Sequence, residues 1–368
     1  MMSSPMLQAV HLAEQAKGDT APNPCVGAVL TKDDAIEASG WHRGPGCPHA
    51  EVEAIAHARK QGLDLTQLTL WVTLEPCNHY GRTPPCTQAI LEAGIPRVII
   101  GTLDPNPQVS GGGADRLRRQ GVEVRIGEKE LECLDLILDF KAWTLEQRPF
   151  VQLKLASTLD GRIATRSGHS AWVTGEQARQ RVHGMRARAQ AVLVGSGTLY
   201  ADDPYLTQRV EQGGKQPWAV VAGSRLPAAD SPLHVLRERA QALVFWTSLD
   251  QAESDQALAL RNMGVRVWGL PQGAGGALDL AQGLHRLFQE LQVYTLVCEG
   301  GGRLGMSLIQ AGGVDELHMV FAPKVLGDTL GISVLSGREV QCMDDALPLR
   351  LVSQEPVGPD LWLVYRRP

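Results

Sequence analysis

Apolar runs and segments of helical periodicity alternate along the first part of the chain. Dense apolar runs, which predict buried strands, occur at residues 26–31, 68–74, 98–101 and 122–126. Apolar positions at helical spacing predict helices over residues 5–17, 49–60 and 86–91, over a stretch that ends at Gln120, and over 128 to about 145. Asp33-Asp34 predicts a hairpin that returns through Ile36. This rhythm predicts a mostly parallel sheet with helices on both faces.

The same rhythm restarts after Arg148-Pro149, where we expect a domain boundary. Strands are predicted at residues 151–155, 191–194, 219–222, 243–247, 265–270, 296–298, 317–322, 349–353 and 361–366, the last two as a hairpin across 356–359. Helices are predicted at residues 176–188, 281–291 and 304–311. Single cores rarely grow beyond ~250–300 residues. A chain of 368 residues therefore predicts two α/β domains, 1–147 and 148–368.

Charge and cysteine content narrow the class of protein. A net charge of -5 argues against a nucleic-acid binder that uses a broad basic face, but it permits small anionic ligands. Seven cysteines, an odd number spread unevenly over a large chain, favour metal binding or reduced thiols over disulfides. The N-terminus lacks a basic stretch followed by an apolar one, and no apolar run approaches the ~20 residues that span a bilayer. We expect a cytoplasmic protein without a membrane segment.

The strongest chemical signal lies between His49 and Cys86. His49, Cys77 and Cys86 supply one imidazole and two thiolates, a set that holds zinc and leaves a fourth position for water. Both cysteines are predicted at helix starts, where the helix dipole lowers a thiol pKa. Glu51 lies two residues from His49, and we expect it to carry a proton from the attacking water to the leaving group. A closed structural zinc site, or no site, remains the alternative.

The second half offers a different kind of signal. Residues 151–209 contain hydroxyls, a glycine-rich turn after a strand and acids beside a proline, but no evident nucleophile–base pair or second metal cluster. The segment LVCEGGGRLG at 296–305 places glycines between a predicted strand and a predicted helix. Such a turn lets backbone N–H groups approach a pyrophosphate, although a simple tight connection would look similar.

Five motifs together resemble one enzyme family. The loop EPCNHYGRTPPC at 75–86 separates its cysteines by eight residues, in contrast to the shorter C-x-x-C spacing of most zinc deaminases. PNPCVG at 22–27, GWH at 40–42, PHAEV at 48–52 and DPNPQV at 104–109 occur in the same order. The chain resembles, over nearly its whole length, the bifunctional deaminase/reductase of riboflavin biosynthesis. Two departures are Cys25, where the family often has asparagine, and Cys47, either a competing metal ligand or a spare thiol.

The resemblance implies the fold, the cofactors and two reactions. It implies an N-terminal cytidine-deaminase-like three-layer domain and a C-terminal dihydrofolate-reductase-like α/β domain. Zinc would serve hydrolytic deamination of 2,5-diamino-6-(5-phosphoribosylamino)pyrimidin-4-one, and NADPH would then reduce the ribosyl chain of 5-amino-6-(5-phosphoribosylamino)uracil to ribityl. The alternatives are a zinc deaminase of another nucleotide with a non-catalytic C-terminal binding domain, and a non-enzymatic ligand sensor with structural zinc. A homo-oligomer is compatible with the sequence, which does not determine it.

The resemblance also assigns residues to the two sites. In the deaminase half, Asn23 and His42 would hydrogen-bond to the pyrimidine edge, and Arg82 would bind the phosphate. The alternative for Arg82 is a solvated loop residue. The cofactor contacts would be Ala156, Trp172, Thr198, Ser224, Gly301, Gly302, Arg303, Leu304 and Gly305. The reductase substrate contacts would be Lys154, Ser170, Arg186, Asp202, Leu206, Arg209 and Glu299. Arg186 and Arg209 would hold the 5′-phosphate, and Asp202 would donate the proton, with Asp203 as the alternative acid.

Overall fold

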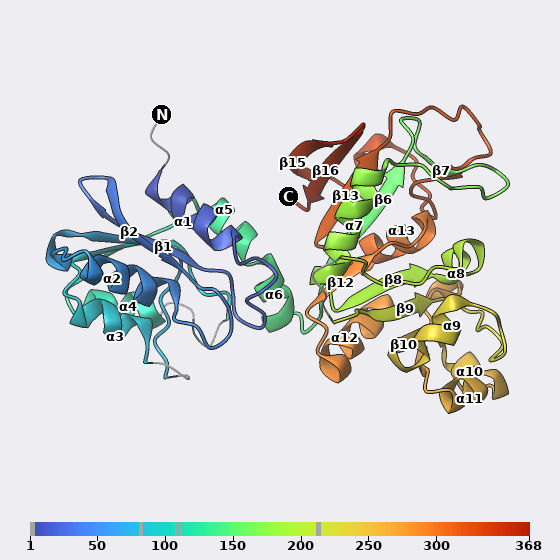
Figure 1. The fold of residues 1–368 in the computed structure, drawn as a ribbon, viewed down its shortest axis with the longest axis horizontal. Coiled ribbons are helices and arrows are strands. Elements are labelled where there is room, and N and C mark those ends of the chain that lie inside the picture. Colours follow the sequence, from blue (N-terminus) through green and yellow to red (C-terminus); the bar gives the residue numbers. More distant parts are fainter. Residues whose placement is uncertain (1–3, 81–83, 107–108, 110–111, 211–214) are drawn as a thin grey trace. The chain divides into compact units, whose positions relative to one another are not determined.

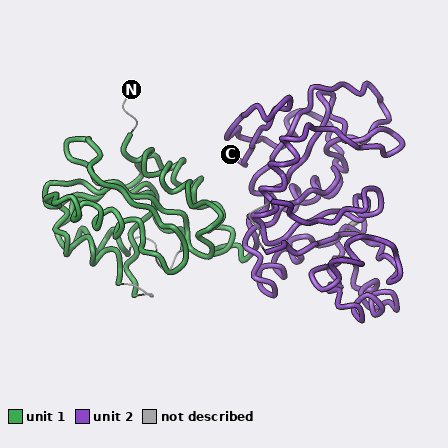
Figure 2. The backbone as a smooth tube through the Cα atoms, in the orientation of Figure 1, with its two compact units in different colours: residues 1–147 green, residues 148–368 purple. Residues whose placement is uncertain are grey.

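A five-stranded sheet forms the centre of the first of two units, which comprise residues 1–147 and 148–368 (Figure 2). The computed structural model describes residues 4–80, 84–106, 109, 112–210 and 215–368. Within these residues no helix combines the length and the apolar character that crossing a membrane requires.

The sheet of the first unit is mixed. Its strands, in the spatial order β2-β1-β3-β4-β5, are β1 (Gly27–Lys32), β2 (Ala35–Trp41), β3 (Thr69–Leu74), β4 (Arg97–Thr102) and β5 (Glu123–Ile126). β1 is antiparallel to β2 and β3, whereas β3, β4 and β5 are parallel. The expectation of a mostly parallel sheet is therefore wrong for this unit. The predicted hairpin explains the difference, because Asp33 and Asp34 both adopt positive φ and return the chain beside β1.

Helices cover both faces of this sheet, so the unit has three layers (Figure 1). One face packs against α2 (Ala50–Lys60), α3 (Cys86–Glu92) and α4 (Gly112–Arg119), and the other against α1 (Pro5–Glu14) and α5 (Glu130–Leu136). Strand alternation sets the faces, because Ala28 and Leu30 join one core and Val29 the other. The single helix predicted over 128–145 is wrong: Ile137 leaves helical geometry, and α6 (Leu138–Thr144) follows separately. A short 3₁₀ turn, Leu65–Gln67, precedes β3.

The second unit is built on a nine-stranded sheet in the order β11-β10-β9-β8-β12-β6-β13-β16-β15. Its strands are β6 (Phe150–Ser157), β8 (Ala191–Gly195), β9 (Trp218–Ala222), β10 (Leu243–Ser248), β11 (Arg266–Leu270), β12 (Thr295–Cys298), β13 (Glu316–Phe321), β15 (Arg350–Val357) and β16 (Asp360–Arg366). All strands from β11 to β13 in this order are parallel, and the β15–β16 hairpin adds two antiparallel strands. The hairpin turn is tighter than predicted, because β15 continues to Val357. A separate pair joins β7 (Arg162–Ala164) to β14 (Ile332–Ser333).

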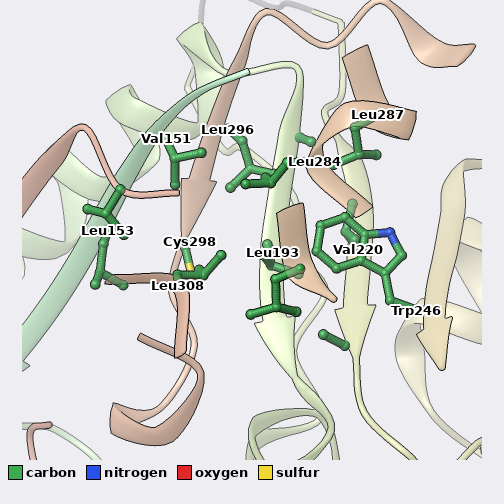
Figure 3. Packing of buried hydrophobic residues seen from close by; sticks show 14 of the residues in the cluster. Val151, Leu153, Leu193, Val220, Trp246, Leu284, Leu287, Leu296, Cys298 and Leu308 are labelled. Atoms are coloured by element: carbon green, nitrogen blue, oxygen red, sulfur yellow. The ribbon is translucent and has the colours of Figure 1, made fainter. Parts of the chain in front are cut away.

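Both faces of this sheet are also covered. The helices are α7 (Glu176–Arg188), α8 (Ser196–Asp202), α9 (His234–Arg239), α10 (Leu249–Ala252), α11 (Asp255–Asn262), α12 (Leu280–Leu291) and α13 (Gly302–Gln310), with 3₁₀ turns at Ala240–Ala242, Ala274–Gly276 and Met343–Asp345. α12 and α13 pack Leu284, Leu287 and Leu308 against Leu193 and Trp246 in the core shown in Figure 3. α8, α9 and α11 pack on the opposite face. Helices α8 to α11 were not predicted, because they are short and carry few apolar positions at helical spacing.

Candidate active sites

The three predicted metal ligands meet in the first unit. His49 directly precedes α2, Cys77 follows β3, and Cys86 is the first residue of α3. Their ligand atoms all lie within 4.8 Å of one another, and no other such cluster occurs among the described residues. His49 Nδ1 lies 3.2 Å from Cys86 Sγ and 3.6 Å from Cys77 Sγ. One imidazole and two thiolates at this spacing fit tetrahedral zinc with one open position.

The predicted helix position of Cys77 is wrong, because this residue lies in a loop after β3. Its sulfur is stabilised from a neighbouring helix instead: the backbone N–H of Cys86, at the start of α3, donates to Cys77 Sγ at 3.3 Å. A hydrogen bond from Cys86, together with His49, lowers the pKa of Cys77 well below its usual value. The same contact and burial raise the pKa of Cys86. These directions favour a thiolate at Cys77, the form in which cysteine binds zinc.

Glu51 lies in the first turn of α2 and is only 3% exposed. Burial, with the nearby Cys77 thiolate, raises the pKa of Glu51 to about 7. A carboxyl group with this pKa both accepts and releases a proton near neutral pH. Its position beside the cluster therefore matches the predicted role in proton transfer.

Asn23 and His42 form a pair next to the cluster. Asn23 Nδ2 lies 3.0 Å from His42 Nε2, and His42 Nδ1 lies 3.1 Å from the carbonyl oxygen of Pro48. The His42 ring lies 5.3 Å from the His49 ring, so the structure brings these predicted substrate contacts to the metal-ligating residues. Arg82, the predicted phosphate contact, lies outside the described residues.

The two unexpected cysteines have different surroundings. Cys25 is buried 3.3 Å from Thr20 Oγ1, and burial raises its pKa to about 11, so it stays a thiol. Cys47 is half-buried and does not belong to the cluster of three ligands. The described geometry therefore favours a spare thiol at position 47.

Glu75 is a structural contributor that we did not predict. This buried carboxylate accepts hydrogen bonds from the backbone N–H groups of Gly113 and Ala114, at 3.0 and 2.9 Å, at the start of α4. It also accepts from the N–H of Asp104 at 3.3 Å. Glu75 thus fixes the loop that carries Cys77, and its place directly before Pro76-Cys77 was the available sequence signal.

The second unit gathers its predicted cofactor residues along one edge of the sheet. Strands β9, β8, β12 and β6 are parallel neighbours, and Ser224, Thr198, Gly301 and Ala156 lie at or just beyond their carboxyl ends. Ligands of open parallel sheets bind at this edge. The predicted residues, far apart in sequence, therefore belong to one region.

Two helix N-termini meet at this edge. α8 follows β8 and α13 follows β12, and a Cβ atom on Gly301 would lie only 4.0 Å from Thr198 Oγ1. Gly301 supplies no capping side chain to α13, so the first-turn N–H groups, including those of Arg303 and Leu304, remain available to a phosphate oxygen. A Cβ on Gly302 would lie 2.6 Å from the carbonyl oxygen of Val334, so only glycine fits there. These features fit a pyrophosphate-bearing cofactor such as NADPH.

Ser224 lines a polar pocket with Tyr200, Arg225, Gln251 and Gln256. The guanidinium of Arg225 lies over the Tyr200 ring, 4.9 Å from its centroid. Arg225 was not predicted, although an arginine next to a serine predicted to contact the cofactor is a recognisable phosphate-binding signal.

Trp172 lines a separate hollow with Thr158, Arg162, Ser170 and Lys324. Trp172 is 69% exposed, and the Arg179 guanidinium carbon lies 4.6 Å from the centroid of its ring. Lys324 Nζ donates to the Trp172 carbonyl oxygen at 2.8 Å. Trp172, a predicted cofactor contact, and Ser170, a predicted substrate contact, therefore line the same hollow.

The structure separates the two candidate acids. Ser170 Oγ donates to Asp202 Oδ1 at 3.3 Å, which places Asp202 beside a predicted substrate contact. Asp203 instead accepts the backbone N–H of His234 at 2.9 Å, and its second oxygen lies 2.6 Å from His234 Nδ1. Because Asp203 is engaged with α9, the geometry supports Asp202 as the acid.

Ionic interactions connect three other predicted substrate contacts, Arg186, Glu299 and Lys154. Arg186 makes a two-point ion pair with Glu299, at 2.5 and 3.0 Å, and donates to the Thr207 carbonyl oxygen at 2.9 Å. Burial alone would raise the pKa of Glu299, but Arg186 and Lys154 lower it below its usual value. Burial lowers the pKa of Lys154, an effect that Glu299 opposes. Two cationic side chains, Arg186 and Lys154, therefore face a single carboxylate in this cluster.

Three neighbours complete this region. Arg209 is exposed and lies over the Tyr205 ring at 5.5 Å. The Leu206 side chain is buried in the core, so only its backbone is available to a ligand. His183 was not predicted: its buried Nδ1 atom has no hydrogen-bond partner among the described residues, and its pKa is lowered by burial and by Arg186 and Arg209.

Known proteins match both units. Residues 2–102 match the family "Cytidine and deoxycytidylate deaminase zinc-binding region", and residues 149–363 match "RibD C-terminal domain". The riboflavin biosynthesis protein RibD of Aquifex aeolicus is 40% identical, with 98% of this chain and 97% of that protein covered. RibD of Escherichia coli is 37% identical, with 97% of each chain covered.

Solved structures are also similar to this chain over nearly its whole length. RibD of Acinetobacter baumannii (form 1) has a TM-score of 0.76 at 34% identity, covering 98% of this chain and 97% of that one. A diaminohydroxyphosphoribosylaminopyrimidine deaminase/5-amino-6-(5-phosphoribosylamino)uracil reductase from Thermotoga maritima has a TM-score of 0.77 at 36% identity, covering 99% and 98%.

These matches confirm the predicted fold class, a cytidine-deaminase-like domain followed by a RibD-type reductase domain. They do not favour a deaminase with a non-catalytic second half, because the reductase family covers residues 149–363. The chain therefore belongs to the RibD family of riboflavin biosynthesis, whose members combine a zinc-binding deaminase domain with an NADPH-dependent reductase domain.

Proposed function

We propose that the first unit deaminates 2,5-diamino-6-(5-phosphoribosylamino)pyrimidin-4-one and that the second reduces the resulting 5-amino-6-(5-phosphoribosylamino)uracil. The similar enzyme from Thermotoga maritima is named for a diaminohydroxyphosphoribosylaminopyrimidine and for the same uracil, which supports this choice of substrates. The observation that carries the proposal is the meeting of His49, Cys77 and Cys86 within 4.8 Å beside the buried Glu51.

In the first reaction, water replaces the 2-amino group, which leaves as ammonia. Zinc held by the three ligands would supply a Lewis acid with a position for water. Glu51 takes a proton from the attacking water and gives it to the departing amine, because its pKa of about 7 suits both transfers. Asn23 and His42, which lie beside His49, contact the pyrimidine edge, and Arg82 is the proposed phosphate contact.

In the second reaction, opening of the ribosylamine ring leaves C1 of the sugar as the carbon to be reduced. NADPH would supply the hydride when bound along the edge formed by Ala156, Thr198, Ser224 and the turn from Gly301 to Gly305, with Trp172 as a further proposed contact. Asp202 donates the proton that the ring oxygen needs, with Ser170 as its hydrogen-bond partner. Arg186, Arg209, Lys154 and Glu299 form the polar surface that holds the phosphorylated sugar, and the backbone of Leu206 completes it.

A two-step assay on the purified full chain tests this proposal. Incubation with the diaminopyrimidine nucleotide should release ammonia without NADPH, and addition of NADPH should then give oxidation of the cofactor and a ribityl product. Ammonia release without any NADPH oxidation, from folded and zinc-loaded protein, would contradict the reductase half. NADPH oxidation only when the uracil is supplied would contradict the deaminase half.

A further inference from the structure

The turn after α8 has an unusual backbone. It runs from Asp202 to Leu206, both residues of the proposed reductase site, and includes two non-glycine residues with left-handed φ angles: Asp203 at 39° and Leu206 at 51°. Aspartate tolerates this region, but a leucine there is uncommon. The turn therefore needs contacts from outside to keep its shape.

The first residue of α9 supplies one set of these contacts. The His234 backbone N–H donates to Asp203 Oδ1 at 2.9 Å, and His234 Nδ1 lies 2.6 Å from Asp203 Oδ2. The imidazole also lies against the Tyr205 ring, with centroids 4.0 Å apart. The start of α9 is thus joined to the middle of the turn.

The last residue of α9 supplies a second set. Arg239 is only 7% exposed, and its Nη1 atom donates to the carbonyl oxygens of Tyr205 and Leu206, at 3.3 and 2.5 Å. Its Nη2 atom donates to the carbonyl oxygen of Pro217. Within the described residues no carboxylate forms an ion pair with Arg239, so this buried charge is directed entirely at backbone carbonyls.

Packing of α9 does not require these polar contacts. Val235 and Leu236 lie in the same apolar core as Leu199 of α8 and Leu206 of the turn. The apolar side chains of α9 already anchor the helix to the sheet. The polar groups at its two ends instead fix the shape of the turn, because both contact the residues from Asp203 to Leu206.

We infer that Asp203, His234 and Arg239 are positioning residues of the reductase, which hold Asp202, the Leu206 backbone and Arg209 in place for 5-amino-6-(5-phosphoribosylamino)uracil. The inference rests on the proposed function of the second unit. None of the three needs to touch the substrate. The NADPH edge at Thr198, Ser224 and the Gly301–Gly305 turn lies outside these contacts.

Steady-state kinetics of the full chain test this inference. Asp203→Ala and Arg239→Met should each raise KM for the uracil substrate by roughly tenfold, since small displacements of binding groups weaken productive binding. KM for NADPH and the rate of deamination should stay within about twofold. Asp203→Asn should restore nearly normal KM, because asparagine tolerates a left-handed φ and still accepts the His234 N–H.

Matched variants separate positioning from general destabilisation. Ser254→Ala removes a side-chain cap of α11, where Ser254 accepts the Ala257 N–H at 3.2 Å, and Arg366→Met removes another arginine that is 7% exposed. Both should lower the unfolding temperature without changing KM for the uracil. Equal changes in the KM values for the uracil substrate and for NADPH in Asp203→Ala and Arg239→Met would overturn the inference. An unchanged KM for the uracil substrate in these variants, once they are shown to be folded, would also overturn it.

Asp202→Asn, measured beside these variants, separates a failure of the positioning role from a failure of the proposed reductase site. Loss of reduction in Asp202→Asn with unchanged KM in Asp203→Ala and Arg239→Met would overturn the positioning role alone. Full reduction by Asp202→Asn would overturn the proposed site and the positioning role together.

Discussion

The two units build their sites in different ways. In the first, the metal-ligating residues and Glu51 lie within residues 49–86, and three side chains converge to within 4.8 Å. In the second, the proposed contacts extend from Lys154 to Gly305 and depend on four parallel strands lying side by side. Loss of one metal ligand removes the whole first site, whereas loss of one contact in the second leaves the others in place.

Removal of a metal ligand should have the largest effect. Cys86→Ser should lose zinc and all measurable deamination, because two protein ligands cannot hold zinc tightly with an open position. NADPH-dependent reduction of the uracil substrate should persist. Metal analysis and the two separate assays check this, and Cys47→Ser is the matched control that should keep both zinc and deamination. Zinc loss in the control would return Cys47 to the ligand set.

Glu51→Gln should lower the deamination rate by ~10³-fold, since general acid–base catalysis contributes about 10²–10⁴. Zinc content should not change, because Glu51 is not one of the three ligands. Ammonia release together with metal analysis measures both effects. Glu92→Gln, a change at an exposed position of α3, serves as the control. Deamination that survives in Glu51→Gln would remove Glu51 from proton transfer.

Asp202→Asn should lower reduction by about 100-fold and leave deamination unchanged, because only the proton donor of the second site is lost. NADPH oxidation with the uracil substrate measures the loss. Asp203→Asn should have a far smaller effect on the rate, since Asp203 contacts His234 and Asp202 contacts Ser170. The reverse order of the two variants would make Asp203 the acid.

The free energy of unfolding should depend on pH through Glu51 of the first unit. The pKa of Glu51 rises from 4.5 to about 7 in the folded protein, so the folded state binds the proton more tightly than the unfolded state. The free energy of unfolding of the metal-free protein should therefore fall by up to about 3 kcal/mol as the pH rises from 4.5 to about 7. Urea unfolding of wild type and Glu51→Gln at about pH 5 and pH 8 measures this effect, and the variant should gain relative stability at the higher pH.

Arg225→Ala should have the smallest effect. We expect KM for NADPH to rise about tenfold while KM for NADH changes little, because a guanidinium beside Ser224 fits the additional phosphate of NADPH. Initial rates with both cofactors measure this ratio. Arg303→Ala is the comparison, since Arg303 is exposed in the first turn of α13, where any contact would involve the pyrophosphate that both cofactors share. Equal loss with NADH would contradict a role for Arg225 in cofactor preference.

Residue chemistry by itself determined the first site. A histidine, two cysteines and a glutamate in this order indicated a zinc site, because few other side chains bind zinc, and the fold then brought the three candidate ligands together. The strands and long helices were also predictable, since buried segments carry apolar periodicity over enough residues to be recognised. The second site was identified only through family resemblance, because its individual residues are common and its glycine turn is a weak signal.

The sequence thus determined two α/β units and a metal-binding set, while the tertiary structure decided how the remaining groups are used. Only the fold shows that Cys77 receives its N–H donor from α3 and not from a helix of its own. Only the fold assigns Asp203 to α9 and leaves Asp202 beside Ser170. The physical reason is that such contacts depend on register and helix placement, which arise from long-range packing and leave no local pattern in the chain.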